Sequence, residues 1–538
     1  MNAAVQTYDY VVVGGGSAGC AVAARLAQDG RTRVLLLEAG PPDRNIWIHI
    51  PIGYGKTMFD PVVNWQFKSQ PEPHLNNRQI YTPRGRTLGG SSSINGLIYI
   101  RGQREDFDDW RAHGCEGWGY DDILPYFRRS ETNDRGASEF HGGDGPVHVG
   151  SIKGRHELVE AFIAAANSIG VPRNDDFNGA QQRGVGYFQL NTRAGLRSSS
   201  AKAYLGSGIA GKNLHVVTDA HAERVLFEGR RAVGVRYRVG KEVVEARAAR
   251  EVVLSAGALQ SPQLLMLSGI GDGDKLAQHG VGVLHHLPEV GRNLQDHLQS
   301  RVMYRCSKPI TTNDALRTVW GRARIGLQWL LFKSGPVAAG IQLGGLFANT
   351  IDLQGRPDVQ FHFGTISADM AAGKPHDFSG FTMSVCQLRP TSRGEVGLLS
   401  PDARAAPSVL FNYLSTPEDQ ATMVRGVRMA RQLARTPSMS PYIVDEYRPG
   451  FDVESDDEAL AFIREHGTTI FHPVGTCRMG SDANSVVDTR LKVRGIDGLR
   501  VVDASIMPLL VSGNTNAAAI AIGEKGADLI REDARQAA

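Results

Sequence analysis

Apolar residues at the start of the chain fall into short runs that are separated by glycines and by one stretch of small residues. Residues 8–13 (YDYVVV) are rich in β-branched and aromatic side chains and stop at three glycines, which is typical of a buried strand. Residues 18–27 predict a small-residue helix, and residues 33–37 predict a second strand that ends at Glu38. The pattern therefore predicts a strand, a tight turn, a helix and a strand.

Similar patterns recur far along the chain. Strands are predicted at residues 252–256, 359–363, 394–399 and 499–503, and helices at residues 264–267, 417–433 and 516–530. Neither an internal repeat nor a low-complexity linker separates these segments. Two interleaved domains are therefore expected, rather than two domains that follow one another.

Composition narrows the class of protein. The chain of 538 residues is 41% hydrophobic and 21% charged, as expected for a globular protein with two or three cores. Its net charge is +3, without blocks of like charge, so we expect no nucleic-acid partner. Five scattered cysteines without CxxC spacing favour a reducing compartment over a disulfide framework.

Targeting and membrane signals are weak. The start MNAAVQTYDYVVVGGG does not read as a secretory signal. The longest uncharged run, residues 504–523, contains Pro508 and Gly513 and favours a loop and a helix over a membrane span. A cytoplasmic location is expected, and peripheral contact with the inner membrane stays open.

Metal-binding patterns are incomplete. Residues 156–160 begin like HExxH but end at Glu160, and the pair His285 and His286 lacks a third ligand nearby. We therefore predict no metal site.

The glycines after the first predicted strand match the GxGxxG fingerprint. Gly14 allows a sharp turn, Gly16 lets the backbone approach a pyrophosphate, and Gly19 lets the helix pack closely on the strand. Glu38 can accept hydrogen bonds from ribose hydroxyls and would repel a 2′-phosphate. The spacing predicts a dinucleotide site that disfavours NADP.

The same glycines support a second chemistry. Residues 15–19 also match GxSxG, the nucleophile elbow of α/β-hydrolases, with Ser17 as the nucleophile. In a hydrolase this elbow follows several strands, whereas here it follows the first one, and Glu38 would have no role. The nucleotide interpretation is favoured, and a serine hydrolase remains an alternative.

Two longer stretches carry more specific information. They are GRTLGGSSSINGLIYIRGQREDFD at residues 85–108 and GALQSPQLLMLSGIG at residues 257–271. The small residues of LGGSSSIN let backbone amides and hydroxyls approach a flat polar ring. With the first glycines and with FHPVGTCRMG at residues 471–480, these stretches resemble the glucose-methanol-choline oxidoreductase family. Its members are flavin adenine dinucleotide (FAD) enzymes that mostly oxidise alcohols.

The resemblance implies a set of cofactor contacts. It places the serine-rich loop against the flavin and Asp503 at the ribityl or ribose hydroxyls of the cofactor. It also places the backbone of Ala222 at the adenine, while Trp65 either packs near the adenine ring or belongs to the core. Ile94 stands where members with covalent flavin often carry histidine, so we predict that FAD binds non-covalently. The candidates for cofactor binding are Gly14, Gly16, Ser17, Ala18, Gly19, Glu38, Ala39, Trp65, Gly90, Ser91, Asn95, Gly96, Ala222, Asp503, Ala504 and Asn516.

The catalytic candidates are His472 and Asn514. A neutral imidazole can take the hydroxyl proton of an alcohol while hydride leaves for flavin N5, and the resemblance assigns this role to His472. It implies that the Asn514 amide donates to the alkoxide or orients the substrate oxygen. The alternative is that Asn514 and Asn516 only cap the helix at residues 516–530. Arg101 and Arg478 are either charge partners near the site or structural pairs.

These observations predict an FAD-dependent alcohol dehydrogenase. By resemblance to bacterial members of the family, the substrate is a primary aliphatic, choline-like or polyol-like alcohol, and a quinone or another acceptor takes the electrons in place of oxygen. An alcohol oxidase that produces hydrogen peroxide uses the same residues and stays an alternative, as do a flavin-containing lyase and the Ser17 hydrolase.

The predicted fold is α/β, or α+β overall. A Rossmann-like FAD-binding domain is expected at residues 1–155, 199–300 and 467–538. An interleaved substrate-binding domain on an antiparallel sheet is expected at residues 156–198 and 301–466.

Overall fold

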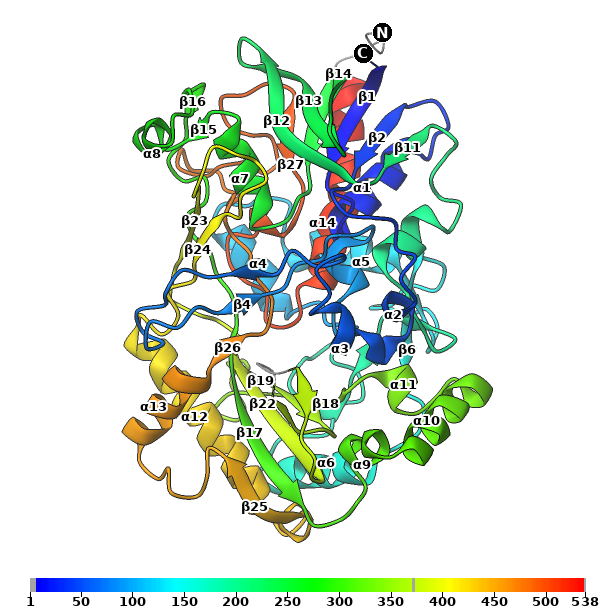
Figure 1. Cartoon of the computed structure of the whole chain (residues 1–538), viewed down its shortest axis with the longest axis vertical. Helices are drawn as coiled ribbons and strands as arrows, with labels where there is room; N and C mark the ends of the chain where they lie inside the picture. The colour runs from blue at the N-terminus through cyan, green and yellow to red at the C-terminus, as the bar shows by residue number, and fades with distance from the viewer. Residues whose placement is uncertain (1–5, 370–372, 537–538) are drawn as a thin grey trace.

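A computed structural model describes residues 6–369 and 373–536 and shows two large sheets at opposite ends of an elongated molecule (Figure 1). The first sheet lies at the top of the view together with the long C-terminal helix α14 (Asn516–Gln536). The second sheet lies at the bottom with helices packed below it. Loops and short helices fill the region between the sheets.

The first sheet has a parallel part and an antiparallel part. Its strand order is β11-β2-β1-β14-β13-β12, and β27 pairs with β14. Strands β11, β2, β1, β14 and β27 run parallel, whereas the consecutive strands β12, β13 and β14 form an antiparallel meander. The strands are β1 (Gln6–Val13), β2 (Val34–Leu37), β11 (Leu214–Val217), β12 (Ala220–Glu228), β13 (Arg231–Val239), β14 (Glu242–Leu254) and β27 (Leu499–Val501).

The predicted strand, turn, helix and strand at the start of the chain are confirmed. Helix α1 (Ser17–Ala27) follows β1 through the glycine turn. Gly14 has a φ of 102°, and a Cβ there would lie 2.4 Å from the Ser255 carbonyl oxygen. A Cβ on Gly19 would lie 1.8 Å from the Gly14 carbonyl oxygen. Only glycine at both positions lets α1 pack this closely on the sheet.

A buried ion pair joins α1 to α14. The Arg25 Nε lies 2.9 Å from Oε2 of Glu524, whose side chain is fully buried. Glu524 also accepts from Arg129 at 2.7 Å and from the Tyr204 hydroxyl at 2.6 Å. These bonds fix α14 along α1, and thereby fix where its N-terminus points.

The second sheet is antiparallel and belongs to the other half of the molecule. Its order is β25-β17-β22-β19-β18-β7, with β26 paired to β17. Helices α6 (Glu157–Ser168) and α12 (Pro417–Ala434) cover one face, where the rings of Phe162 and Phe363 stack at 4.6 Å. The strands are β7 (Gly184–Tyr187), β17 (Leu298–Cys306), β18 (Gln342–Ala348), β19 (Val359–Gly364), β22 (Gly380–Gln387), β25 (Ile443–Arg448) and β26 (Thr468–Thr469).

Alternation along these strands separates an apolar face from a polar one. Val302, Phe363 and Val385 are fully buried on the helix side, whereas Arg301, His362 and Ser384 line a cavity on the other side. Successive side chains of a strand point to opposite faces, so one strand can supply both the core and a site. The open face of this sheet therefore forms the floor of the cavity.

The predicted fold class is confirmed, as are the helices at residues 417–433 and 516–530 and the strand at residues 359–363. Residues 394–399 contain a strand, as predicted, but this strand does not join the second sheet. They form β23 (Glu395–Gly397) in a two-stranded sheet with β24 (Ser408–Leu410), which packs on α7 (Gln260–Leu267) of the first half. The pattern predicts a strand, but strand pairing is a tertiary property. The division into domains stays a prediction, and β17 and β26 extend the second sheet across its borders at residues 301 and 467.

Helices also fill the connections. An insertion between β17 and β18 contains α9 (Thr312–Arg317), α10 (Val319–Phe332) and α11 (Pro336–Ala339), and α10 projects at the right of Figure 1. The other helices are α2 (Ile46–His49), η1 (Pro51–Gly53), α3 (Tyr54–Thr57), η2 (Gly90–Ser93), α4 (Arg104–Ala112), α5 (Tyr120–Ser130), η3 (Ala201–Leu205), α8 (Gly273–Gln278), η4 (Ser440–Tyr442), α13 (Asp456–His466) and η5 (Ala504–Ile506).

Small sheets complete the fold. They are formed by β3 (Phe67–Lys68) with β4 (Tyr81–Thr82), β5 (Glu131–Asn133) with β6 (Val147–Ser151) and β8 (Gln189–Leu190), β9 (Thr192–Arg193) with β10 (Leu196–Arg197), β15 (Ile270–Gly271) with β16 (His285–His286), and β20 (Ala368–Asp369) with β21 (Lys374–Pro375). All five cysteines are buried and free. Within the described ranges, no helix has the length and apolar character needed to cross a membrane.

Candidate functional site

A cavity of about 370 Å³ lies between the two sheets and reaches from the end of β1 to the start of α14. Every site residue predicted from the sequence lines this cavity except Gly19. Gly19 instead packs against the backbone of Gly14, which is the role that the fingerprint assigns to it. The tertiary structure therefore brings together candidates from both ends of the chain.

The glycine turn and the serine-rich loop form one wall of the cavity. No atom of the described chain lies within 4 Å of the place where a Cβ of Gly16 would be, so this backbone is open to a ligand. Gly90 has a φ of 52°, and its own Cβ would lie 2.7 Å from the Gly16 Cα. The two segments thus touch through glycines, and a flat or phosphate-bearing group can approach both backbones. Ile94 also lines this wall.

Glu38 follows β2 directly and lines the end of the cavity that is formed by the glycine turn. Its carboxylate accepts from the Gly15 amide at 2.9 Å and from the Gly40 amide at 2.8 Å. Burial raises the pKa of Glu38 to about 7. Each oxygen keeps a further lone pair that a sugar hydroxyl can use.

Aromatic packing closes the same end. The ring of Trp65 meets that of His221 edge-on at 5.7 Å, and both residues line the cavity beside Ala222. Trp65 also stacks on Phe67 at 5.7 Å. It therefore belongs to a packed cluster and faces the cavity at the same time.

Asp503 follows β27 on the cavity wall. One carboxylate oxygen accepts from the Gly257 amide at 2.9 Å and from the Ser261 hydroxyl at 2.5 Å, and the other accepts from the Ser505 amide at 2.8 Å. The residues 257–271 that were singled out in the sequence therefore position this carboxylate.

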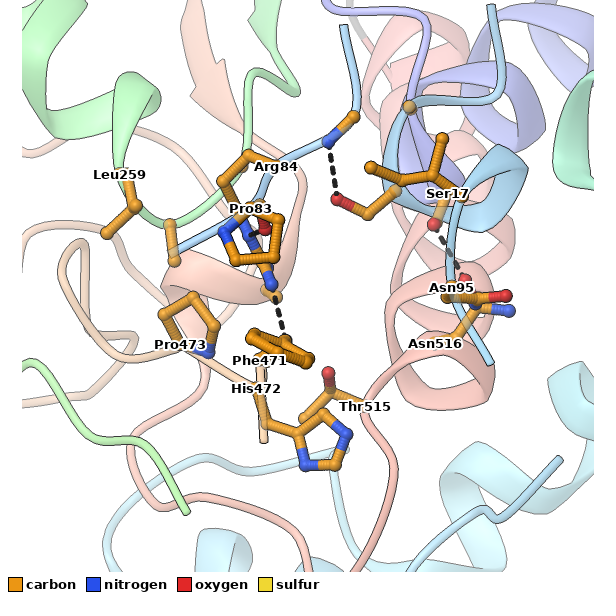
Figure 2. Close-up of a pocket in the computed structure, with 18 of the residues that line it drawn as sticks. Ser17, Pro83, Arg84, Asn95, Leu259, Phe471, His472, Pro473, Thr515 and Asn516 are labelled. Atoms are coloured by element: carbon orange, nitrogen blue, oxygen red, sulfur yellow. Dashed lines mark hydrogen bonds between the residues drawn. The ribbon is translucent and has the colours of Figure 1, made fainter. Parts of the chain in front are cut away.

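Ser17 is engaged by an amide group. Its hydroxyl donates to Oδ1 of Asn516 at 2.8 Å, which Figure 2 shows as a dashed line between the two side chains. An amide oxygen is not a base, so this contact does not activate a nucleophile. The geometry does not support the Ser17 hydrolase.

His472 lies in a constrained turn at the opposite end of the cavity. The preceding residue, Phe471, has a φ of 74°, a left-handed backbone that costs a bulky residue about 1–3 kcal/mol. Three hydrogen bonds hold it: Phe471 N to the Thr469 hydroxyl at 2.7 Å, His472 N to Asp296 at 2.6 Å, and Arg84 to the Phe471 carbonyl at 2.6 Å. Figure 2 shows the last of these, with the His472 ring below Phe471 and facing Thr515.

The contacts of His472 define its tautomer. Leu388 O can only accept, so His297 Nε2, 3.0 Å away, carries a proton. Burial lowers the pKa of His297 to about 4, so its ring is neutral and its Nδ1 accepts. His472 Nδ1 lies 3.0 Å from that atom and must donate to it. The proton-free Nε2 of His472 then accepts from Asn514 Nδ2 at 3.2 Å.

The surroundings keep the His472 ring neutral. Burial, and then the nearby His297, His362 and Arg84, hold its pKa well below the usual 6.5. Burial raises the pKa of Asp296 to about 6. The imidazole therefore stands as a free base at neutral pH.

Asn514 is oriented by a second strand residue. Its Oδ1 accepts from Gln360 Nε2 at 3.2 Å, which leaves the amide nitrogen for His472. The α14 helix begins at Asn516, as predicted. The Asn514 side chain thus faces His472, which is more than a capping role requires.

Sequence reasoning did not identify His297, Gln360 or the polar residues of the second sheet as site residues. His297 ends the run EVGRNLQDH at residues 289–297, which resembles the same family, so this run was the available signal. Gln360 carries no motif, because only strand pairing brings it to Asn514.

Arg101 and Arg478, which the sequence left as either site residues or structural ion pairs, form structural ion pairs. Arg101 forms a buried ion pair with Glu131, and Arg478 lies 2.7 Å from Asp482. Neither residue lines the cavity. Over residues 6–369 and 373–536, no group of three or more His, Cys, Asp or Glu side chains could hold a metal ion.

Comparison with known proteins identifies close relatives. Residues 8–299 match the N-terminal part of the family described as GMC oxidoreductase, and residues 390–523 match its C-terminal part. An alcohol dehydrogenase (acceptor) from Pseudomonas putida is 44% identical over 528 residues, 97% of this chain and 95% of that protein. An oxygen-dependent choline dehydrogenase from Serratia proteamaculans is 43% identical over 532 residues, 98% of this chain and 96% of that protein.

A solved structure extends the likeness to three dimensions. A formate oxidase from Aspergillus oryzae, studied for its FAD modification, superposes with a TM-score of 0.92 at 28% identity. The alignment covers 99% of this chain and 100% of that one.

Proposed function

The chain belongs to the GMC oxidoreductase family and is a flavoprotein that binds FAD, and on that premise we propose that it oxidises an alcohol to an aldehyde or ketone with His472 as the base. The carrying observation is the proton-free Nε2 of His472, which faces Asn514 in the cavity.

The residues of the cavity fit FAD. The open backbone at Gly16 suits the pyrophosphate at the start of α1, and the contact between Gly16 and Gly90 leaves room for a flat ring beside the serine-rich loop. Glu38 and Asp503 offer carboxylate oxygens to sugar and ribityl hydroxyls. When bound, FAD supplies the hydride acceptor. We infer non-covalent attachment from Ile94, which has no nucleophilic atom.

The protein's own groups manage the proton. An alcohol hydroxyl that takes the place of the Asn514 amide at His472 Nε2 can give up its proton to that lone pair, because the lowered pKa keeps this nitrogen unprotonated at neutral pH. Asn514 Nδ2, 3.2 Å from the same nitrogen, can donate to the alcohol oxygen as negative charge develops. The N-terminus of α14 follows at Asn516 and adds partial positive charge to this end of the cavity.

We propose that the electrons pass to a quinone or another non-oxygen acceptor. The likeness to the P. putida alcohol dehydrogenase (acceptor), at 44% identity, supports this choice. An alcohol oxidase that produces peroxide remains the second candidate, because the formate oxidase shares the fold.

The test uses purified yellow protein without oxygen. Bleaching of the flavin by an alcohol, and slow bleaching in His472→Ala with the flavin still bound, are the expected results. A yellow protein that no alcohol bleaches would point to a lyase. A colourless protein with esterase activity would support the hydrolase with Ser17 as its nucleophile. Dye reduction without peroxide would favour the dehydrogenase, whereas stoichiometric peroxide would favour the oxidase.

A further inference from the structure

Three polar side chains form a row across the floor of the cavity. In the second sheet, Arg301 of β17 stands opposite Ser384 of β22, and Ser384 stands opposite His362 of β19. All three line the cavity. We call Arg301, Ser384 and His362 the polar row. Its His362 end lies next to the catalytic groups, because Gln360, two residues earlier on the same strand and face, donates to Asn514.

The polar row has hydrogen-bonding capacity that the protein does not use. Ser384 is 1% exposed and His362 is 2% exposed. The Ser384 hydroxyl, both ring nitrogens of His362 and the Arg301 Nε have no hydrogen-bond partner within the described parts of the chain. Asn514 lies near His362, outside hydrogen-bond geometry. Buried polar groups are normally paired, so such a cluster facing a cavity indicates a ligand that supplies the partners.

Arg301 sets the charge of the row. Over residues 6–369 and 373–536, its guanidinium has no hydrogen-bond acceptor and no carboxylate within ion-pair distance. Burial lowers its pKa to about 10, and the nearby Tyr54 and Asp369 act in the opposite direction. Among the described residues, the carboxylates that line the cavity are those of Glu38 and Asp503. Both accept hydrogen bonds from backbone amides beside the first sheet.

We propose that the polar row binds a second oxygen function of the substrate, so that this enzyme prefers alcohols carrying another hydroxyl or a carboxylate over simple alcohols and over choline. Donors from Arg301 and Ser384 need an oxygen acceptor, which a quaternary ammonium lacks, and Arg301 repels a cation. The reacting hydroxyl would lie at His472, and the second oxygen would lie one or two strand spacings away. The inference rests on the proposed function and refines it.

The experiment compares substrates of equal length. A straight-chain diol, the corresponding hydroxy acid, the simple alcohol and choline are scored by kcat/KM in wild type, Arg301→Met and Arg305→Met. Arg305 lies on the same strand but is exposed and bonded to Asp445, so it is the matched control. We expect the diol or the hydroxy acid to exceed the simple alcohol by about 10- to 100-fold. Arg301→Met should remove that preference, whereas Arg305→Met should keep it.

The possible results distinguish a failure of the polar-row proposal from a failure of the proposed alcohol oxidation. A higher value for the hydroxy acid would assign a carboxylate to the row, and a higher value for the diol would assign a hydroxyl. Preference for choline or the simple alcohol, or an unchanged ratio in Arg301→Met, would overturn the proposal. If no alcohol reduces the flavin, the proposed function fails, and the row is tested by binding of the same compounds with the reacting hydroxyl methylated. Equal binding to wild type and Arg301→Met would then overturn it.

A second, independent observation concerns the surface of α10. Six large apolar side chains of this helix are exposed, up to 86% for Trp320, and Ile325 is its buried residue. Trp320, Leu327 and Leu331 follow at intervals of seven and four residues and therefore share one stripe. The remaining exposed residues are Val319, Leu330 and Phe332. The apolar stripe of this helix faces away from the protein, where a core helix would face inward.

The charges around the stripe are all of one sign. From residue 318 to residue 339 the charged side chains are Arg322, Arg324 and Lys333. A helix with exposed Trp, Leu and Phe side chains and only cationic charges complements an anionic lipid surface. The same insertion reaches the cavity, because a Cβ on Gly340 would lie 3.2 Å from the ring of Tyr54, a cavity residue.

The geometry points to α10 as a docking site for an anionic membrane surface, with the helix lying in the interface plane. Its 14 residues span about 21 Å, enough to rest on the headgroup region along its length. Docking there would bring the end of the insertion that contacts Tyr54 close to the lipid.

Sedimentation with vesicles tests this surface. FAD-loaded protein is mixed with vesicles of phosphatidylcholine alone or with one third phosphatidylglycerol. We expect binding to the anionic vesicles, a loss of about tenfold or more when Trp320, Leu327 and Leu331 are all changed to serine, and a smaller loss that follows salt when Arg322 and Arg324 are changed to glutamine. The control changes Ile351, Leu399 and Val444 to serine, since these apolar residues are exposed elsewhere.

Two results would overturn the docking proposal. One is equal vesicle binding by the α10 triple variant and by the control. The other is a wild-type dimer that the α10 triple variant dissociates, without vesicle binding by either protein, because α10 would then contact a second copy of the chain.

Discussion

His472 Nδ1 lies 3.0 Å from His297 Nδ1, although 175 positions separate the two residues in the chain. Because His297 is neutral and donates its only ring proton to Leu388 O, its Nδ1 accepts from His472, which leaves the cavity-facing nitrogen of His472 free of a proton. A histidine without this partner could carry its proton on either nitrogen. We therefore propose His297 as a positioning residue for His472, the proposed base.

Removing the acceptor on His297 should slow the proposed reaction. In His297→Phe, His472 loses the contact that selects its tautomer, so flavin reduction by an alcohol should slow by about 10- to 100-fold. His297→Gln should recover part of the rate, since its amide oxygen can accept. Anaerobic stopped-flow absorbance measures the rate, and His113→Phe, at an exposed histidine, is the control. A rate loss matched by FAD loss would show a structural role instead.

Replacing the base itself should have a larger effect. His472→Ala removes general base catalysis, which typically contributes about 10²- to 10⁴-fold. The rate of flavin reduction should fall by that order, while the absorbance of bound FAD stays that of wild type. An unchanged rate would remove His472 from the role.

The depressed pKa of His472 predicts a distinctive pH profile. A base with a lowered pKa is deprotonated above that pKa, so it is ready throughout neutral pH and is lost only on acidification. The rate of flavin reduction should be flat from pH 6 to about pH 9 and fall only at lower pH. In His297→Phe the fall should shift to higher pH. A titration near 6.5 in wild type would contradict the assigned environment.

Filling the open backbone at Gly16 should block the cofactor. A Leu side chain there has free space around its Cβ in the protein, so the fold should survive, but it would occupy the place where the pyrophosphate must lie. We expect Gly16→Leu to purify colourless, with wild-type far-ultraviolet circular dichroism. A yellow Gly16→Leu protein would mean that FAD does not lie against this turn.

The ion pair between α1 and α14 should matter for stability. Glu524→Ala leaves Arg25 buried without its carboxylate, which costs about 3–5 kcal/mol in the free energy of unfolding. The exposed pair of Arg104 and Asp121 is the comparison, and Asp121→Ala should cost at most about 1 kcal/mol. Chemical denaturation measures both variants. Similar losses would show that the buried pair does not anchor α14.

The parts of this protein that depend on contiguous residues were predictable from the chain alone. The run at residues 8–13, the glycines up to Gly19 and Glu38 predict a dinucleotide turn, because turn geometry and strand burial act over a few neighbouring positions. The serine-rich loop and FHPVGTCRMG revealed the resemblance to the family, and that resemblance pointed to His472 and Asn514. Their side chains do meet, at 3.2 Å.

Which distant side chains share an environment could be seen only in the folded protein. His297 meets His472, Gln360 meets Asn514, and Arg301, Ser384 and His362 form a row, because strand register sets which residues stand opposite each other. The local sequence pattern of a strand does not reveal its pairing register. A slip of one residue in that register would nevertheless turn every side chain to the other face of the sheet. For the same reason, the strand at residues 395–397 was predictable, and its partner was not.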